Sequence, residues 1–426
     1  MVQPRSIDRI RLDDVVGVAR DRAPVHVSED VLQTVAAGRD IVERLADSTV
    51  PAYGISTGFG ALATVSIPPV RRASLQVSLI RSHAAGTGPL VAAEVVRAMM
   101  TLRLKTLASG RTGVRPVVVE TLAAMLNQDI TPAVRTYGSL GCSGDLAPLA
   151  HVALAAMGEG EVLAGTGTRP ASTALQEAGI TPLVLAEKEG LALINGTDGM
   201  LGMLALALAD LAGLLRLSDV ATAMTVEALL GTDRVFADEL MDLRPQPGQA
   251  ASAANLRRLL ADSPIMASHR DDMEHIVQDA YSLRCAPQVT GAARDTADHA
   301  RLVAERELAA VIDNPVVLPT GRVASNGNFH GAPVAYVLDF LAIVCADVAS
   351  ISERRTDRML DKTRSHGLPP FLAHEAGVDS GYMIAQYAAA GIVSTLKRLA
   401  VPASVDSIPS SAMQEDHVSM GWAAAL

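Results

Sequence analysis

Apolar residues recur at helical spacing along most of the chain. After Pro116, which suits the first turn of a helix, Val118, Leu122, Met125 and Leu126 fall at i, i+4, i+7 and i+8. This spacing places the four side chains on one face. The pattern predicts an amphipathic helix that starts at about residue 116.

Two further stretches favour helices. Residues 91–109 show the same spacing, with Arg97, Arg103 and Lys105 as polar breaks. Residues 198–230 are apolar almost all round, which predicts helices that other helices enclose. Nothing alternates polar and apolar residues for long enough to suggest a sheet of any size. The patterns therefore predict an all-α protein.

Glycine and proline cluster between the predicted helices. These clusters predict loops at residues 54–60, 86–89, 138–144, 244–248 and 315–331. Loops on a rigid scaffold are where chemistry usually takes place, and most of these loops carry unusual residues. No repeat or flexible linker divides the chain into independent parts.

Composition supports the prediction of a helical protein and argues against one class of binding partner. Of 426 residues, 49% are hydrophobic and only 3% aromatic, with alanine and leucine abundant, which favours helices packed on helices. The net charge of −10 argues against a nucleic-acid partner, because phosphate binding needs a basic face.

Cysteine usage and the apolar runs bear on location. The three cysteines, Cys142, Cys285 and Cys345, form no CxxC pair and predict a reduced, cytoplasmic setting. The N-terminus carries charge where a signal peptide needs an apolar stretch. Residues 199–209, closed by Asp198 and Asp210, are too short to span a bilayer, so we expect a buried helix in a soluble protein without a membrane partner.

The loop at residues 138–151, GSLGCSGDLAPLAH, carries the central motif. Ser143 in an isolated Cys-Ser-Gly tripeptide would be interpreted as the cap of a helix that starts near Asp145, or as part of a glycine-rich turn. The longer string resembles the prosthetic-group segment of the aromatic amino acid ammonia-lyases. In that family an Ala-Ser-Gly cyclises and loses two waters.

The resemblance implies that Cys142-Ser143-Gly144 forms 4-methylidene-imidazol-5-one autocatalytically, with no external cofactor. The Gly144 nitrogen must reach the carbonyl carbon of residue 142, and glycine tolerates such a strained backbone. Cys142 replaces the usual alanine, and its side chain takes no part in ring closure. A reactive-thiol role for Cys142 is the alternative, and it would need a lowered pKa. No GxGxxG fingerprint or Schiff-base lysine supports another cofactor.

The string Tyr53-Gly-Ile-Ser-Thr-Gly-Phe-Gly60 resembles the tyrosine loop of the same family. Taken alone, a tyrosine in a glycine-rich loop could simply pack its ring. The resemblance implies that Tyr53 is the base that removes the β-proton, and that the glycines give a mobile lid. Ser56 stands where the family usually has asparagine.

Residues 278–288, QDAYSLRCAPQ, match the family's carboxylate anchor. The resemblance implies that Arg284 binds the substrate carboxylate with its two parallel donors, that Tyr281 supports the prosthetic ring and that Gln278 lines the site. A surface ion pair is the alternative interpretation of Arg284.

Three further residues match family positions around the substrate. Asn195 matches the asparagine beside the prosthetic group, although Asn-Gly alone signals a turn. Asn314 is implied to hydrogen-bond near the carboxylate, with a helix stop before Pro315 as the alternative. Phe329 is implied to pack on the substrate ring.

Two positions bear on which amino acid is bound. Ser82-His83 and the stretch Gln414-Glu415 resemble the family members that act on histidine. His83 can donate to or accept from an imidazole, although a lone histidine is more often satisfied in the core. Glu415 can accept an imidazole N–H but would be left unpaired against a phenyl ring. A metal site at residues 415–417 is excluded, because consecutive helical residues diverge.

The resemblance covers residues 12–420 and implies an overall organisation. We expect long antiparallel helices in a central bundle, with residues 1–200 carrying the electrophile and base loops and residues 201–426 forming the bundle. The family implies a homotetramer whose sites draw on several chains, and release of ammonia from histidine. A tyrosine or phenylalanine lyase or aminomutase, and an inactive helical scaffold, are the alternatives.

The end of the sequence carries one further expectation. Relatives continue for several helices beyond Leu426, so we expect an incomplete lyase that keeps the fold around Ser143. Such a chain would hold substrate poorly and assemble less stably, because chain ends fray unless tied down. Trp422, the only tryptophan, would lose cover.

Overall fold

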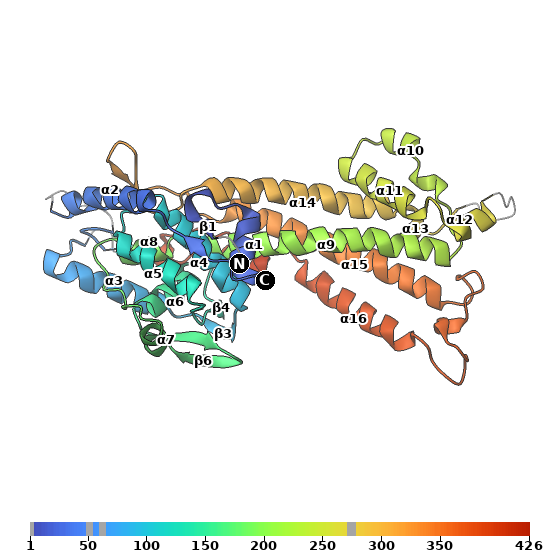
Figure 1. Cartoon of the computed structure of the whole chain (residues 1–426), viewed down its shortest axis with the longest axis horizontal. Helices are drawn as coiled ribbons and strands as arrows, with labels where there is room; N and C mark the ends of the chain where they lie inside the picture. Colours follow the sequence, from blue (N-terminus) through green and yellow to red (C-terminus); the bar gives the residue numbers. More distant parts are fainter. Residues whose placement is uncertain (1–3, 48–53, 59–64, 271–277) are drawn as a thin grey trace. The chain divides into compact units, whose positions relative to one another are not determined.

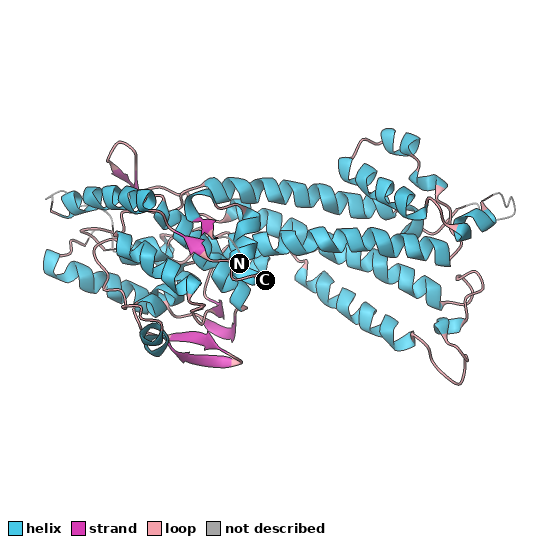
Figure 2. Ribbon diagram, viewed as in Figure 1, coloured by secondary structure: helices cyan, strands magenta, loops and turns pink. Residues whose placement is uncertain are grey.

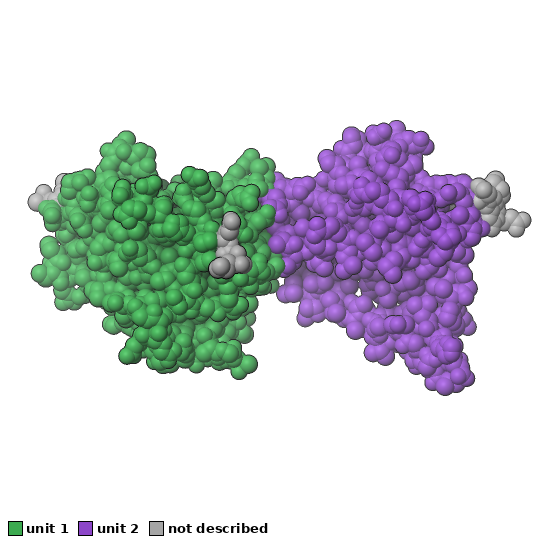
Figure 3. Space-filling view, in the orientation of Figure 1, with its two compact units in different colours: residues 1–207, 302–336, 403–426 green, residues 208–301, 337–402 purple. Residues whose placement is uncertain are grey.

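The computed structural model describes residues 4–47, 54–58, 65–270 and 278–426. The described chain is mostly helical, as Figure 2 shows, and its strands form two-stranded sheets. It divides into two compact units (Figure 3). Unit 1 comprises residues 1–207, 302–336 and 403–426, and unit 2 comprises residues 208–301 and 337–402.

Unit 1 contains most of the short elements. Its helices are η1 (Ile7–Arg9), α1 (Leu12–Arg20), α2 (Glu29–Ala46), α3 (Pro69–His83), α4 (Ala93–Ala108), α5 (Pro116–Asn127), α6 (Leu146–Ala156), α7 (Ala171–Glu177), α8 (Glu189–Ile194), η5 (Ser411–Met413) and α17 (Gly421–Ala425). Three long helices have residues in both units: α9 (Asp198–Ala228), α14 (Ala286–Ala309) and α15 (Ala332–Leu360).

The strands pair as short ribbons in unit 1. Strand β1 (Arg5–Ser6) is parallel to β2 (Val25–His26). The antiparallel pairs are β3 (Thr87–Leu90) with β4 (Arg135–Tyr137), β5 (Glu161–Ala164) with β6 (Gly167–Pro170), and β7 (Val316–Val317) with β8 (Val323–Ala324). In the described part of the chain each sheet has only two strands of two to four residues, so the prediction of an all-α fold is confirmed.

The helix predicted after Pro116 is α5, and its four apolar positions Val118, Leu122, Met125 and Leu126 are buried. Helix α5 packs against α4, which in turn packs against α1 (Figure 1). The apolar stripe therefore lies in the core of unit 1, as its spacing predicts.

Arg97 and Arg103 do not interrupt the buried surface of α4, contrary to the sequence prediction. Both side chains are almost fully buried. Arg97 donates to the carbonyl oxygens of Val18 and Leu126, and Arg103 donates to that of Ile312. Because a buried guanidinium must be paired, these two arginines bind backbone carbonyl oxygens of neighbouring segments.

Unit 2 is built on the remaining parts of α9, α14 and α15. Its other helices are η3 (Arg234–Phe236), α10 (Asp238–Asp242), α11 (Pro247–Leu260), α12 (Pro264–His269), α13 (Tyr281–Arg284), η4 (Pro370–Leu372) and α16 (Met383–Leu399). One apolar cluster holds the end of α9 to the short helices, with Phe236, Met241, Leu256 and Met266 buried in it.

Helix α9 is longer than its most apolar stretch predicts and continues through Asp210. Residues 198–206 at its start are buried, but Leu214, Leu217, Val220 and Met224 are exposed. The predicted enclosure is therefore wrong for the second half of α9 within the single chain. By length and composition, α9 and α15 would each be long enough to cross a membrane, a test that core helices of soluble proteins also pass.

Trp422 is buried in unit 1, with 2% of its surface exposed, so the expected loss of cover is wrong. Its indole Nε1 donates to the carbonyl oxygen of Thr136 at 2.8 Å. A Cβ on Gly199 would lie 2.3 Å from the indole ring, so the ring packs directly on the backbone of α9.

Candidate active site

The loop before α6 is held against the start of α9. Gly144 has a φ of +74°, and a Cβ there would lie 2.1 Å from the carbonyl oxygen of Gly196. The next amide, of Asp145, donates to that same oxygen at 2.7 Å. Only glycine satisfies both the backbone angle and this approach, so residue 144 is fixed by geometry.

Asp145 connects the loop to α9. Its carboxylate accepts from the amides of Gly199 and Met200 at 2.9 and 3.0 Å, and from Ser139 Oγ at 2.8 Å. Complete burial raises the pKa of Asp145 to about 7, against the opposing effect of these donors. The first amides of α9 thus find their acceptor in the loop that carries Ser143.

Ser143 points to a carboxylate and does not cap α6. Its Oγ donates to Glu415 Oε1 at 3.0 Å, and the residue at the N-cap of α6 is Asp145. The cap interpretation is therefore wrong. Glu415 also accepts from Ser410 Oγ at 2.6 Å and from Cys142 Sγ at 3.2 Å, both at Oε2. Three hydroxyl or thiol donors surround one half-buried carboxylate.

Cys142 is a hydrogen-bond donor here. Burial, and then the negative charge of Glu415, raise the pKa of the Cys142 thiol to about 11. Near neutral pH the thiol keeps its proton, whereas a nucleophilic cysteine needs a thiolate. The reactive-thiol alternative lacks the lowered pKa that it requires.

Asn195 directly follows α8 and contacts the backbone of Ser143. Its side-chain Nδ2 donates to the carbonyl oxygen of Ser143 at 2.8 Å. Its Oδ1 is buried and has no hydrogen-bond partner among the described residues. A turn residue would not need this contact, so the side chain of Asn195 has a specific partner in the motif.

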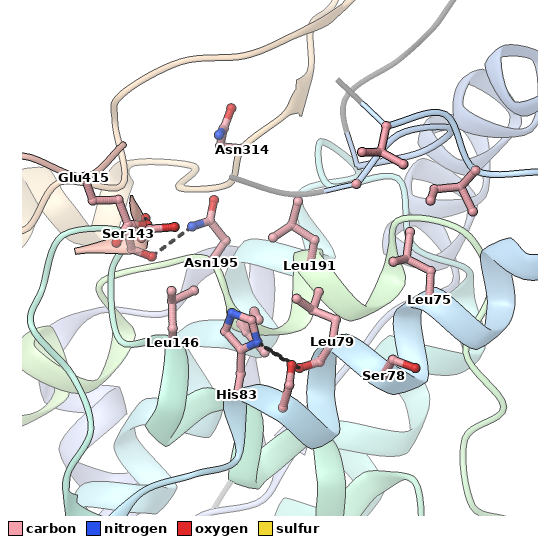
Figure 4. Close-up of a pocket in the computed structure, with 16 residues that line it drawn as sticks. Leu75, Ser78, Leu79, His83, Ser143, Leu146, Leu191, Asn195, Asn314 and Glu415 are labelled. Carbon is pink, nitrogen blue, oxygen red and sulfur yellow. Dashed lines mark hydrogen bonds between the residues drawn. The ribbon is translucent and has the colours of Figure 1, made fainter. Parts of the chain in front are cut away.

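A cavity of about 530 Å³ opens beside Ser143 (Figure 4). It is large enough for an amino acid, and its wall is mainly apolar with a few convergent polar groups. The residues that line it are Gly58, Val65, Ile67, Leu75, Ser78, Leu79, Ser82, His83, Ser143, Leu146, Leu191, Ile194, Asn195, Asn314, Ser411 and Glu415. Unit 1 provides all of these residues.

His83 is the last residue of α3 and lines this cavity. Its Nδ1 lies 2.9 Å from the carbonyl oxygen of Leu79, which can only accept. Nδ1 therefore carries the proton, and in the neutral ring Nε2 is left as an acceptor. Ser82 Oγ also lies 3.1 Å from Nδ1, so the ring is oriented from the α3 side.

Asn314 is placed in the cavity wall by its own loop. Helix α14 ends at Ala309, before Asn314, so the helix-stop interpretation is wrong. Asn314 Oδ1 accepts from the Asn326 amide at 3.0 Å, and Asn326 Nδ2 donates to the Asp313 carbonyl at 2.9 Å. The buried Asp313 side chain pairs with Lys188.

The structure thus gathers His83, Ser143, Asn195, Asn314 and Glu415 around one cavity. Cys142 joins them through Glu415. Phe329 is half-buried and Gln414 is exposed, and neither is among the described residues that line the cavity. Tyr53 lies outside the described residues.

The predicted carboxylate anchor belongs to unit 2. Gln278 is exposed, and Tyr281 and Arg284 form the two ends of α13. The Arg284 guanidinium lies over the Tyr281 ring, 4.6 Å from its centre, and Tyr281 is 70% exposed. In the described part of the chain, Arg284 Nε has no hydrogen-bond partner.

Several lining residues escaped the sequence prediction. Leu75, Ser78 and Leu79 lie at i, i+3 and i+4 on α3. They share a helical face with Ser82 at i+7, which the sequence already singles out beside His83. Leu191 stands four positions before Asn195, and Ile194 directly precedes Asn195. Once one lining residue on a helix is known, its neighbours three, four and seven positions away are candidates for the same wall.

The comparisons with known proteins identify the family. A profile described as aromatic amino acid lyase matches residues 10–426. The chain belongs to the aromatic amino acid lyase family. The histidine ammonia-lyase of Streptomyces avermitilis is 65% identical to this chain over 417 residues, covering 98% of this chain and 81% of that protein. The histidine ammonia-lyase of Streptomyces griseus is 66% identical over 414 residues, covering 97% and 80% respectively.

Solved structures of this lyase family share the fold. Tyrosine aminomutase from Streptomyces globisporus aligns with a TM-score of 0.91 at 38% identity, over 99% of this chain and 83% of that one. Histidine ammonia-lyase from Trypanosoma cruzi aligns with a TM-score of 0.90, also at 38% identity, over 99% and 80%. Because enzymes of two activities fit almost equally well, the fold leaves the substrate to be argued from the site.

Proposed function

We propose that the protein is a cytoplasmic histidine ammonia-lyase, which eliminates ammonia from L-histidine to give urocanate, the first step of histidine breakdown. The observation that carries the proposal is the contact between Ser143 and Glu415 in a cavity that His83 also lines. The close relatives from Streptomyces, which bear that name, support it.

Cys142, Ser143 and Gly144 fit the prosthetic group of the family. Gly144 already has the left-handed backbone and the close approach that exclude any side chain. Asn195 donates to the Ser143 carbonyl, which would become the carbonyl of the ring. When formed, 4-methylidene-imidazol-5-one supplies an electrophile that assists the departure of the amine. Three residues of this chain are sufficient for it, without an external cofactor.

Glu415 and His83 account for the choice of histidine. The Glu415 carboxylate accepts the imidazole N–H, and His83 lines the same cavity from α3. A phenyl ring would leave the half-buried carboxylate without that partner, at a cost of about 1–3 kcal/mol. Tyrosine and phenylalanine lyases and aminomutases share the fold, so this pairing is what favours histidine over them.

The remaining roles follow the family motifs. Tyr53 removes the β-proton, Asn314 binds near the carboxylate, and Phe329 and Gln414 contact the substrate from the loops that flank the site. General-base assistance of this kind contributes roughly 10²–10⁴ in rate.

Arg284 binds the substrate carboxylate, with Tyr281 and Gln278 beside it. These three residues belong to unit 2, whereas the cavity is built by unit 1. We propose a homotetramer in which each active site combines residues of several subunits. The Tyr281 ring is 70% exposed, which is consistent with a partner from another copy.

Two measurements test the proposal. The intact mass of the purified chain should be lower than that of its sequence by two waters, with a near-UV band that Ser143→Ala lacks. Histidine should give urocanate far faster than tyrosine or phenylalanine give their products. An unmodified mass would contradict the lyase assignment, and faster turnover of phenylalanine would contradict only the substrate.

A further inference from the structure

The two oxygens of the Glu415 carboxylate have different partners. Oε1 accepts from the Ser143 hydroxyl at 3.0 Å. Oε2 accepts from Ser410 Oγ at 2.6 Å and from Cys142 Sγ at 3.2 Å. Formation of the prosthetic group removes the Ser143 hydroxyl as water, whereas the Ser410 hydroxyl and the Cys142 thiol take no part in that reaction. After ring formation, Oε1 therefore loses its donor and Oε2 keeps both of its own.

Ser410 is held in a fixed relation to Glu415 by the backbone. The Ser410 amide donates to the Glu415 carbonyl at 2.8 Å, and the Glu415 amide donates back at 3.3 Å. The turn between them passes through Ser411, Ala412 and Met413, which have φ angles of 51°, 55° and 67°. Left-handed residues persist only where surrounding contacts determine them, so this closed turn sets where the Ser410 hydroxyl lies.

Cys142 contacts the Glu415 carboxylate from the loop that precedes α6. Its thiol is buried and retains its proton near neutral pH, which makes it a donor to Oε2. An alanine at this position would offer no donor. Donors from two loops, one before α6 and one before α17, therefore hold the Glu415 carboxylate.

We propose that Ser410 and Cys142 are positioning residues, which hold Oε2 of Glu415 so that Oε1 faces the cavity as the acceptor for the substrate imidazole. The inference rests on the proposed function, since that function supplies the imidazole. Holding one oxygen fixes the side-chain rotamer before substrate arrives, so binding loses less side-chain entropy. Hydrogen bonds to an ionised acceptor are also stronger than neutral ones.

The direct test measures histidine kinetics on the full chain. Ser410→Ala should raise KM for histidine by about tenfold and Cys142→Ala by about threefold, since a thiol is the weaker donor, with kcat within about twofold of the parent. Ser410→Thr and Cys142→Ser keep a donor and should restore KM. Matched controls are Ser172→Ala on α7 and Cys345→Ala on α15, which should leave KM unchanged.

A double-mutant cycle separates positioning from general destabilisation. If Ser410 acts through the carboxylate, Ser410→Ala should change KM by less than about twofold in a Glu415→Ala chain. Equal KM increases in both backgrounds, or no increase in the parent, would overturn the inference. Each variant must also lose two waters by intact mass. A variant that keeps them would place its residue in ring formation and would overturn the positioning role.

The outcomes distinguish the inference from the proposed function. A parent chain that does not convert histidine contradicts both of them. A parent that converts histidine, with silent Ser410→Ala and Cys142→Ala variants, contradicts the inference alone.

Discussion

Ser143 Oγ lies 3.0 Å from Glu415 Oε1, although 272 positions separate the two residues along the chain. The contact joins the loop before α6 to the turn that precedes α17. In the proposed enzyme it brings the precursor of the electrophile next to the group that selects the substrate. Changes at Glu415 should therefore affect the reacting molecule directly.

Glu415→Gln should lower kcat/KM for histidine by about 10²-fold, because the amide accepts an imidazole N–H without the charge assistance of a carboxylate. The slower turnover of phenylalanine should hardly change. Kinetics with both amino acids measure the effect. Asp416→Asn is the control, since that neighbouring carboxylate is exposed and outside the cavity. Equal relative losses for histidine and phenylalanine would argue against a role in selection.

Gly144→Ala should abolish the loss of two waters and destabilise unit 1. Its Cβ would lie 2.1 Å from the Gly196 carbonyl oxygen, on a backbone at φ +74°. Intact mass and the urea unfolding midpoint measure the two effects. Gly179→Ala is a matched control, because Gly179 has a φ of +69° but nothing within 4 Å of its added Cβ. It should show only the backbone strain of about 1 kcal/mol or more.

Asp145 should make stability depend on pH. Burial raises its pKa from 3.8 to about 7, so the folded state holds a proton that the unfolded state releases. This group therefore favours the folded state below about pH 4, and that advantage is lost as pH rises to about 7. The Asp145→Asn variant cannot ionise at this position, so its stability lacks this dependence on pH.

The measurement compares Asp145→Asn with the parent by urea unfolding at about pH 5 and pH 7. The difference in their free energies of unfolding should shift by on the order of 2 kcal/mol in favour of the variant at the higher pH. A difference that stays constant with pH would mean that Asp145 ionises as easily when folded as when unfolded.

Cys142 should resist alkylation while the chain is folded. With its pKa raised from 9.0 to about 11, its thiolate fraction near pH 7 is about a hundredfold below that of an ordinary thiol. The Ser143→Ala chain, which cannot form the ring, allows iodoacetamide labelling to be followed by peptide mass. The same chain in urea is the control. Labelling of Cys142 at equal rates in both conditions would show a reactive thiol.

The spacing of apolar residues predicted α5 correctly because local periodicity decides which face of a helix is buried. It failed at Arg97 and Arg103, whose burial depends on carbonyl oxygens of Val18, Leu126 and Ile312. Such acceptors come from other segments, and the hydrophobicity of a single segment contains no information about them.

The candidate site likewise contains residues that a local motif predicts and residues that only contacts with other segments bring into place. Ser143, Asn195 and Glu415 are predicted as site residues because each stands in a motif of its own, and all three line the cavity. Ser410 carries no such signal, since its proposed role rests on a closed turn and a side-chain contact that no local pattern specifies. The predicted apolar enclosure of α9 fails at Leu217 and Met224 because an apolar pattern does not specify which segment, if any, covers each side chain.

The burial of Trp422 has a practical consequence. It is the only tryptophan in the sequence, and its indole is enclosed in unit 1 against Thr136 and Gly199. Its fluorescence emission should shift to longer wavelength when water reaches the indole, and unit 2 has no tryptophan to mask that signal. Circular dichroism reports helices of both units. The two signals together give the protein an intrinsic optical label for asking whether the site-bearing unit unfolds separately from the rest.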